Sequence, residues 1–377
     1  MERTTAFIIG DPHFKAGSLK EGADFVERCV NKAKSLRPTF IVCLGDTLDT
    51  HEVGRSQPYN LALQFIDQLS AIAPFYLIIG NHDLINNQQF LTTAHFFNGV
   101  KGHENVTVVD RPIWAEYEDK SFVFVPYVPP GRFEEALSEL TRQGEPWDMA
   151  DAIFAHQEFR GCKMGAIEST QGDEWDEGYP CVISGHIHDA QKVGTNVYYP
   201  GSAIQHAYGE SHDKKVWFVT FEEDGDEPFK VKKIDLGMKS KKIIYTTLDD
   251  VESFDFKQLE KYHIKLSIKG PSEGFKVFRR GAFYAKLIKA GVKMTYSPIV
   301  AERAEVGRHT RDDISYKDVL REIVSAKSDA VKEVYAHVLG EDVGEEVGDE
   351  DADESVSADD DGDEDDEPGC EIVFDFD

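Results

Sequence analysis

The sequence predicts an α/β protein in which helices pack on sheets, and two observations carry this prediction. Short apolar runs typical of buried strands alternate with longer segments whose apolar residues recur at helical spacing. Polar Asp, Asn and His side chains directly follow most of these apolar runs. In open α/β sheets ligands collect beyond the carboxyl ends of the strands, so the placement of these polar residues agrees with the predicted fold.

The strand and helix patterns lie in the first 221 residues. Six apolar runs predict buried strands: Thr5–Gly10, Phe40–Leu44, Phe75–Ile79, Phe122–Pro126, Ala152–Ala155 and Cys181–Ser184. Two segments, Lys20–Leu36 and Tyr59–Ile72, predict amphipathic helices, since apolar residues such as Phe25 and Phe65 fall on one face. Residues 197–221 predict a strand, a turn and a further strand.

The charge distribution and local composition predict four parts along the chain. We expect a first domain over 1–225, a small α+β unit over 226–310, a helical segment over 311–340 and a tail over 341–377. The net charge is −15 over 1–225, +6 over 226–340 and −20 over the tail. A helix is predicted over 312–339, and the acidic low-complexity tail is predicted to be disordered.

Composition also bears on cellular setting. The five cysteines are scattered without a C-x-x-C pair, which argues against a disulfide framework and a thiolate zinc site. The apolar runs are too short to span a bilayer, and the N-terminus has no apolar signal core. We therefore expect a soluble, cytoplasmic protein that does not bind a membrane.

Five short stretches together carry the ligands of a two-metal site. They are Asp11-Pro12-His13, Gly45 to Asp49, Gly80 to Asp83, Ala155-His156 and Gly185 to His188. Their candidate ligands are Asp11, His13, Asp46, Asn81, His156, His186 and His188. Carboxylate, imidazole and amide donors suit Mn²⁺, Fe²⁺ or Zn²⁺ and are poor for Ca²⁺. Two such ions lower the pKa of water from about 16 towards 7, which favours hydrolysis of phosphate esters.

Each ligand can be given a provisional role. Asp46 is the natural bridging ligand, because a carboxylate can bind one metal through each oxygen. Asp11, His13 and His188 would complete the first metal site, and Asn81, His156 and His186 the second. We assign His82 as the general acid that protonates the leaving alkoxide, and Asp49 as the residue that orients it. Four other histidines are predicted not to be ligands: His51, His95, His103 and His206.

At this point the residues resemble a known superfamily. The five stretches are similar to those of the calcineurin-like metallophosphoesterases, over about residues 5–221. A longer stretch narrows the resemblance: Ser184 to Gln191, then Tyr199-Pro200-Gly201-Ser202, then Tyr208-Gly209-Glu210. It resembles the bacterial and phage SbcD-type exonuclease subunit, a relative of the eukaryotic double-strand-break repair nuclease. Many archaeal and eukaryotic members have His at the position of Asp49, which places this chain nearer the bacterial and phage branch.

The resemblance implies a fold and an activity. The expected fold is a four-layer α/β/β/α sandwich of two mixed sheets flanked by helices, followed by a small α+β capping domain. The expected activity is Mn²⁺-dependent cleavage of DNA in recombination and repair: exonuclease on duplex ends and endonuclease on single strands. The expected partners are DNA, an ABC-type coiled-coil ATPase of the SbcC type and a second copy in a homodimer. By motif, the seven ligands and His82 keep the roles given above.

Two regions beyond the motifs are candidates for contacts. A phosphate-binding surface is predicted for Lys230, Lys232, Lys233, Lys241, Lys242, Lys276, Arg279 and Arg280, against the alternative of a merely solvated lysine-rich surface. The helix over 312–339 would dock on the ATPase or pack on its own domain. The acidic tail with its apolar tip is either a solubilising segment or a mimic of DNA.

Two other functions remain open at this stage. The first is a phosphodiesterase or phosphatase acting on small nucleotides or phosphoproteins. The second is a non-catalytic scaffold on the same fold, which the full set of metal ligands disfavours.

Overall fold

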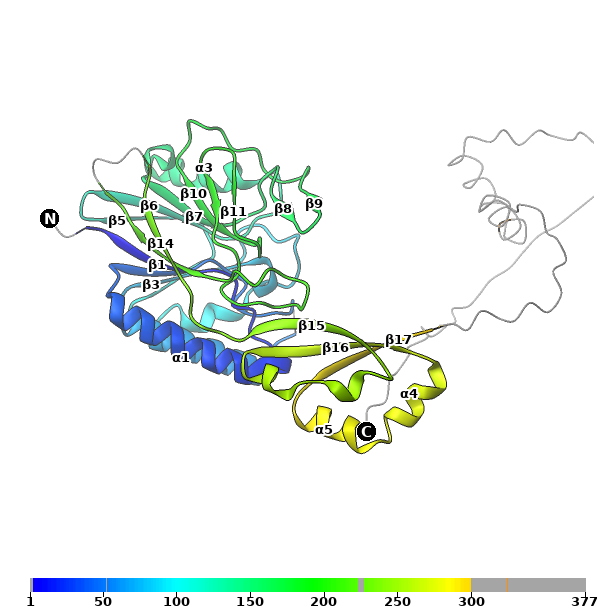
Figure 1. Ribbon diagram of the computed structural model, residues 1–377. Helices are drawn as coiled ribbons and strands as arrows, with labels where there is room; N and C mark the ends of the chain where they lie inside the picture. Colours follow the sequence, from blue (N-terminus) through cyan, green and yellow to red (C-terminus); the bar gives the residue numbers. More distant parts are fainter. Residues whose placement is uncertain (1–2, 52, 223–226, 300–323, 325–377) are drawn as a thin grey trace, which may run out of the picture. The chain divides into compact units, whose positions relative to one another are not determined.

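Two six-stranded sheets and one three-stranded sheet organise the chain (Figure 1). The computed structural model describes residues 3–51, 53–222, 227–299 and residue 324. The helix predicted over 312–339, apart from residue 324, and the acidic tail lie outside the described residues. Their predicted roles therefore stay predictions.

The first sheet has the strand order β14-β13-β1-β2-β3-β4. Its parallel strands are β1 (Thr5–Ile9), β2 (Phe40–Cys43), β3 (Phe75–Ile78) and β4 (Val106–Val109). Two antiparallel strands, β13 (Val216–Thr220) and β14 (Lys230–Ile234), extend it beyond β1. Helices α1 (Leu19–Leu36) and α2 (Ser56–Ser70) cover its outer face with buried apolar residues. Phe65 of α2, for example, packs edge-on against Phe75 of β3.

The second sheet has the order β11-β12-β10-β7-β6-β5. Its parallel strands are β6 (Lys120–Val125), β7 (Ala152–His156), β10 (Val182–Gly185) and β12 (Val197–Tyr199). The antiparallel edge strands are β5 (Ile113–Tyr117) and β11 (Gln191–Val193). Helix α3 (Phe133–Gln143) covers the outer face through Phe133, Leu137 and Leu140.

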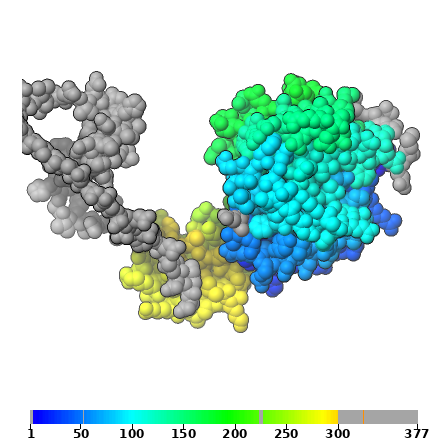
Figure 2. Space-filling view, turned by 180° about the vertical axis from the view of Figure 1, so that it is seen from behind, coloured from blue at the N-terminus to red at the C-terminus, as the bar shows by residue number. Residues whose placement is uncertain are grey.

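Aromatic side chains fill the space between the two sheets. Tyr76 of the first sheet stacks on Phe124 of the second, with ring centroids 3.8 Å apart, and Phe124 in turn stacks on Phe154. The layers are therefore helices, sheet, sheet and helix, and the predicted fold class is confirmed. In Figure 2, which views the molecule from behind, the blue segment and the green segment lie on opposite sides, with the cyan segment between them.

The six predicted strands and both predicted helices are confirmed within one or two residues, except that α2 starts three residues early, at Ser56. The strands predicted within 197–221 also form, but they do not pair with each other. Strand β12 lies in the second sheet and β13 in the first, so the segment between them crosses from one sheet to the other. Sequence alone could not show this crossing, because each strand is equally apolar in either sheet.

A small parallel sheet follows, with the order β15-β16-β17. Its strands are β15 (Ser240–Thr247), β16 (Tyr262–Gly270) and β17 (Lys293–Pro298), and helices α4 (Ser272–Phe278) and α5 (Ala282–Lys289) connect the last two. These elements share an apolar core of their own that includes Ile264, Leu266 and Leu287. A separate two-stranded hairpin, β8 (Lys163–Met164) and β9 (Ile167–Glu168), stands outside all three sheets.

Candidate metal centre

The seven predicted ligands lie at the carboxyl ends of five parallel strands. Asp11 and His13 follow β1, Asp46 follows β2 and Asn81 follows β3. From the second sheet, His156 ends β7, and His186 and His188 follow β10. Parallel strands in both sheets end at the same edge of the sandwich, so ligands distant in sequence converge there.

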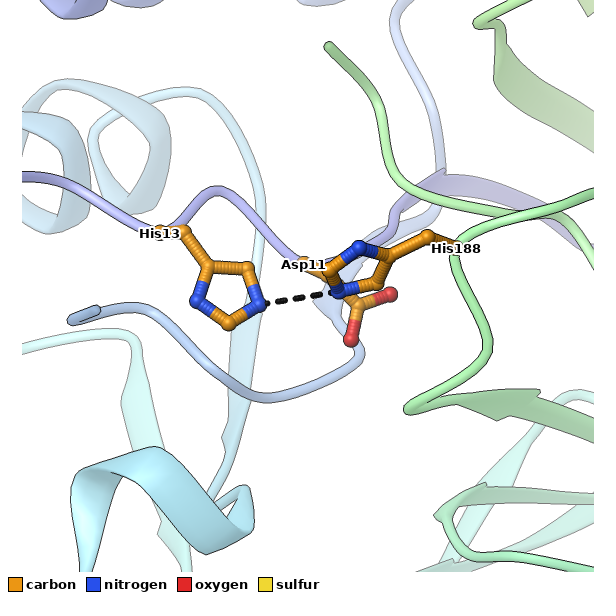
Figure 3. A group of neighbouring side chains, drawn as sticks. All are labelled: Asp11, His13 and His188. Atoms are coloured by element: carbon orange, nitrogen blue, oxygen red, sulfur yellow. Dashed lines mark hydrogen bonds between the residues drawn. The ribbon is translucent and has the colours of Figure 1, made fainter. Parts of the chain in front are cut away.

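The first cluster contains Asp11, His13, Asp46 and His188. Figure 3 shows the rings of His13 and His188 pointing toward one another beside the Asp11 carboxylate, with their Nε2 atoms 3.1 Å apart. The Nε2 atom of His13 also lies 3.5 Å from Oδ2 of Asp46. One donor atom each from Asp11, His13 and His188 lie within 4.8 Å of one another.

The second cluster contains Asp46, Asn81, His156 and His186. Nε2 of His156 lies 3.3 Å from Oδ2 of Asp46 and 3.0 Å from Oδ1 of Asn81. Nδ1 of His186 lies 3.0 Å from the same Asn81 oxygen. Asp46 thus belongs to both clusters, but through the single oxygen Oδ2 rather than through one oxygen for each ion, because Oδ1 accepts the backbone N–H of His82.

These residues fit a pair of divalent ions. Donor atoms bound to one ion at about 2.1 Å lie roughly 3 to 3.5 Å from one another, which matches the distances in both clusters. Oδ2 of Asp11 and Nδ1 of His13 are buried and have no hydrogen-bond partner among the described residues. An unpaired buried carboxylate oxygen is costly, and a cation would compensate it. That the seven residues bind metal stays a prediction.

Burial and the neighbouring Asp46 carboxylate together set the protonation of the histidines. It lowers the pKa of His13 well below its usual value and lowers that of His186 to about 3, so both rings are neutral and able to bind a cation. Burial also disfavours charge on His156, but the Asp46 carboxylate outweighs it and raises the pKa to about 9. Burial raises the pKa of Asp11. For Asp46 burial acts in the same direction, but His156 and His13 outweigh it and lower the pKa well below its usual value.

His82 lies beside the bridging carboxylate and is fixed at two points. It belongs to the short 3₁₀ turn Asn81–Asp83, and its backbone N–H donates to Oδ1 of Asp46 at 2.9 Å. Its Nδ1 donates to the backbone carbonyl of Asp49 at 2.9 Å. The prediction that Asp49 orients His82 therefore needs correction: the carbonyl makes the contact. The Asp49 carboxylate instead pairs with Lys15 at 3.2 Å and lies 3.6 Å from His13, because the loop after β2 turns it that way.

Two residues near the centre were missed or underestimated from sequence. His206, predicted to stand apart, donates from Nε2 to the Asp11 carbonyl at 2.8 Å, and its ring lies 4.7 Å from that of His13. Glu210 accepts from Nδ1 of His188 at 3.3 Å, which leaves Nε2 of His188 as the atom facing His13. The Tyr-Gly-Glu stretch was the signal for Glu210. No local pattern marks His206.

Of the other histidines set aside from sequence, two lie away from the centre, and His51 lies beside His82. His95 pairs with Asp110, and His103 with Asp67. His51 stacks on His82, with ring centroids 4.5 Å apart. Asp83 is structural: its carboxylate accepts the backbone N–H groups of Thr47, Leu48 and Gly80 and so ties the second and third motifs together.

The turns that carry the ligands have an unusual backbone. Asp11, His13, Asp46 and His186 all have positive φ, between 40° and 78°. This left-handed region costs roughly 1–2 kcal/mol for a residue with a side chain, although Asp and His enter it more readily than most. Close packing adds a further constraint, because a Cβ on Gly80 would lie 2.2 Å from the Asp46 carboxylate.

Two pockets lie near the centre and share no residue. One, of about 230 Å³, contains none of the seven predicted ligands; its lining includes Lys15, Arg55 and Asp49, whose carboxylate lies 3.6 Å from His13. The other, of about 310 Å³, is lined by His186 and His188, by Glu210 and by the β8–β9 hairpin.

The predicted DNA-contacting residues do not form one surface unit. Lys230, Lys232 and Lys233 lie on β14, in the first sheet rather than in the small one. Lys241 must be withdrawn from the set, since it is 7% exposed and its Nζ pairs with Glu21 at 2.8 Å. A lysine held in this way cannot reach a phosphate without breaking a buried ion pair.

The remaining basic residues make weaker interactions within the protein. Lys230 pairs with Glu222, Lys276 with Glu273, and Lys242 contacts Gln258. Lys233 lies over the ring of Trp217 and Arg279 over that of Tyr296. Lys232 and Arg280 make no ion pair within the described part of the chain. DNA contact by these seven residues stays a prediction.

Fold and centre together define a class: a hydrolase of phosphate esters built around a carboxylate–histidine cluster. The chain matches the Calcineurin-like phosphoesterase family over residues 4–190. It is 42% identical over 284 residues to "Putative phosphoesterase 244L" of Invertebrate iridescent virus 6, covering 74% of this chain and 99% of that protein. It is 37% identical over 330 residues to "Putative phosphoesterase 078R" of Invertebrate iridescent virus 3, covering 87% and 94%. The chain therefore belongs to the calcineurin-like phosphoesterase family and is a metal-dependent hydrolase.

The chain also has a distant likeness to a solved protein structure. A solved dimetal phosphatase from Danio rerio covers 62% of this chain and 96% of its own, at 15% identity and a TM-score of 0.42. That likeness is too distant to carry an argument about the site. Among the described residues, no helix has both the length and the apolar character needed to cross a bilayer.

Proposed function

We propose that this hydrolase is a nuclease that cleaves phosphodiester bonds in DNA during recombination or repair. The observation that carries the proposal is the pocket at His186 and His188, whose lining continues past these residues to the β8–β9 hairpin. A phosphodiester bears a substituent on each side of phosphorus, whereas a monoester bears one. A pocket that extends beyond the predicted ligands therefore suits a diester within a strand, because the strand continues past the scissile phosphate.

A second observation supports the nuclease subclass. Glu210, in the Tyr-Gly-Glu stretch that suggested the SbcD-type nucleases, contacts the metal-binding residue His188. By holding Nδ1, Glu210 fixes the ring orientation of His188, and such outer contacts tune a metal site strongly. The stretch thus has a role at the centre, which the resemblance alone did not explain.

The chain's own residues divide the reaction between them. Two divalent cations, when bound, supply a nucleophile at neutral pH and stabilise charge on the phosphate oxygens. Asp46 is positioned to bind both ions, and neutral His13 and His186 offer lone pairs to them. His82 then protonates the leaving oxygen from Nε2, because its Nδ1 is occupied by the Asp49 carbonyl.

The finer parts of the proposal concern metal and partners. Mn²⁺ is the proposed ion, with Fe²⁺ or Zn²⁺ compatible with the same donors. The proposed partners are a coiled-coil ATPase of the ABC type and a second copy of the chain. These follow from the resemblance to the SbcD type, and co-purification of the two subunits from a joint expression would test them.

A substrate panel tests the activity. The full chain, loaded with Mn²⁺, is given linear duplex DNA, a single-stranded oligonucleotide, a cyclic nucleotide and a phosphorylated peptide. We expect cleavage of both DNA substrates, and none by an Asp46→Ala variant. Turnover of the cyclic nucleotide or the peptide, with both DNA substrates left intact, would replace the nuclease proposal by a small-molecule phosphodiesterase or a phosphatase.

A further inference from the structure

The β8–β9 hairpin stands beside the metal centre on a firmly fixed base. Phe159 and Cys162, just before it, are buried, and the N–H of Ser169 donates to the Cys162 carbonyl at 2.8 Å. Its tip is open to solvent, with Met164 43% and Ile167 68% exposed. A rigid stem with an apolar exposed tip is unusual for a surface loop, which normally carries polar residues.

A single side chain fixes the start of this hairpin. Oε1 of Gln191 accepts the N–H of Lys163 at 2.8 Å, and Nε2 of Gln191 donates to the Lys163 carbonyl at 2.9 Å. Gln191 ends the Gly185-to-Gln191 stretch that supplies His186 and His188. The same short stretch therefore provides two metal-binding histidines and sets where Lys163 lies.

Lys163 lines the 310 Å³ pocket together with His186 and His188. The acidic residues of this pocket already have partners: Glu210 contacts His188 and Lys214, and Asp189 lies 3.6 Å from Lys214. Glu168 is opposite Lys163 in the hairpin register, but Lys163 forms no ion pair with any residue that the structure describes. Lys163 thus remains available to an anion at this pocket.

We propose that Lys163 binds the phosphate next to the scissile one on the nucleic-acid strand, and that Gln191 is its positioning residue. The inference rests on the proposed nuclease function and deepens it. A strand whose scissile phosphate lies at the metals must continue past the pocket walls, and its next phosphate is the group that an unpaired lysine there would bind. A small diester has no such phosphate and gains nothing from Lys163.

The experiment compares two substrates in the Mn²⁺-loaded full chain: a single-stranded oligonucleotide and bis(p-nitrophenyl) phosphate. We expect Lys163→Ala to raise KM for the oligonucleotide about 5- to 10-fold with kcat unchanged, and to lower the salt slope of log KM by about 0.7, the value for one phosphate contact on a single strand. Kinetics on the small diester should not change. Lys163→Arg should restore KM, and Lys192→Ala, which removes a nearby exposed lysine outside this pocket, should have no effect.

The role of Gln191 is tested by a double variant. Gln191→Ala alone should raise KM for the oligonucleotide without changing turnover of the small diester. In the Lys163→Ala background it should add nothing, because it acts through Lys163. Additive effects would mean that Gln191 acts independently of Lys163 and would overturn its positioning role.

The outcomes separate this inference from the proposed function. If the wild-type chain hydrolyses bis(p-nitrophenyl) phosphate but leaves every nucleic acid intact, the nuclease proposal fails, and this inference with it. If the wild type cleaves the oligonucleotide while Lys163→Ala keeps its KM and salt slope, only the role of Lys163 is refuted.

Discussion

His82 and Asp46 are connected by a backbone hydrogen bond as well as by their proposed roles in the same reaction. The His82 N–H donates to one oxygen of the Asp46 carboxylate, and the other oxygen faces His13 and His156. A substitution of the His82 side chain leaves the N–H in place. The two functions, holding metal and moving a proton, can therefore be separated by experiment.

We expect His82→Ala to lower kcat for DNA by about 10²- to 10⁴-fold, the usual contribution of a general acid. Bis(p-nitrophenyl) phosphate releases a leaving group that needs no proton, so its kcat should fall less than about tenfold. Metal content, measured by elemental analysis, serves as the control and should stay at the wild-type level. Equal losses on both substrates would assign His82 to orienting the phosphate instead.

Asp110 offers a pH test away from the centre. Burial alone would raise its pKa, but hydrogen bonds from His95 and Lys101 outweigh burial and hold the pKa below 3.8. A depressed folded-state pKa contributes stability above the unfolded value, and this stability is lost as the pH falls below it. Asp110→Asn should therefore cost about 1 kcal/mol at pH 7, and this cost should shrink as the pH falls through the folded-state pKa, so that it is smaller at pH 3.

Urea unfolding at the two pH values measures this difference. Asp119→Asn, which removes an exposed carboxylate, is the matched control and should leave stability unchanged at both. If Asp110→Asn lowers the free energy of unfolding equally at pH 7 and pH 3, the site depends on the shape of the Asp110 side chain and not on its charge.

Local motifs made the ligands predictable, and distance in sequence made the rest unpredictable. Asp11, Asn81 and His188 each sit in a short recognisable stretch after an apolar run. His206 lies 195 residues from Asp11 and meets it only through the tertiary fold. The role of the Asp49 carbonyl was unpredictable for a different reason. Any residue at that position would supply a backbone carbonyl, so the residue type gives no signal.

Strand β15 connects the small sheet to the large domain by a buried charge pair. Lys241 on β15 reaches Glu21 on α1, and its N–H also donates to the Gln205 side chain at 2.6 Å. From sequence this lysine was indistinguishable from its neighbours in a basic run. Burial, which only the assembled elements create, changes its role from a candidate DNA contact to a structural one.

Lys241→Ala should destabilise the chain by about 3 to 5 kcal/mol, because the largely buried Glu21 carboxylate loses its lysine and keeps only His263, at 3.8 Å, beside it. Lys232→Ala, on an exposed position of β14, should change stability by less than about 0.5 kcal/mol. Urea unfolding of the full chain measures both. The joint variant Glu21→Gln with Lys241→Met should recover much of the loss; no recovery would mean that the charge pair is not its cause.

On the scale of the whole molecule, metal binding and folding should be linked. The centre gathers two carboxylates in a buried site, and Oδ2 of Asp11 has no hydrogen-bond partner among the described residues. The predicted ligands come from both sheets, so an ion should bind only when the sandwich is assembled. An ion that binds the folded state alone stabilises it by mass action.

Removal of metal should therefore lower the melting temperature. Mn²⁺ at a hundred times its Kd should stabilise the chain by about 2.7 kcal/mol relative to the chelated protein. Differential scanning calorimetry with and without EDTA measures the shift, and an Asp46→Ala variant should show little of it. A melting temperature of the wild-type protein that does not change with Mn²⁺ would contradict the proposed centre.

The layered architecture was predictable because alternation of strands and helices and the position of the motifs agree with each other. The crossing of the chain between β12 and β13 was not, since periodicity reports burial and not the identity of the neighbouring sheet. The same limit applies to β14. Its lysines show that the strand is charged, but they do not show that it belongs to the first sheet.

The left-handed turns at Asp11, His13, Asp46 and His186 have a consequence for protein engineering. Glycine would relax each of these turns, so thermostability screens that use metal-free protein and ignore activity would favour it there. The gain in melting temperature would come with the loss of a predicted metal ligand, and with it the stabilisation expected from the ions. A search for heat-resistant variants should leave these four positions fixed and look to the helices and the small sheet instead.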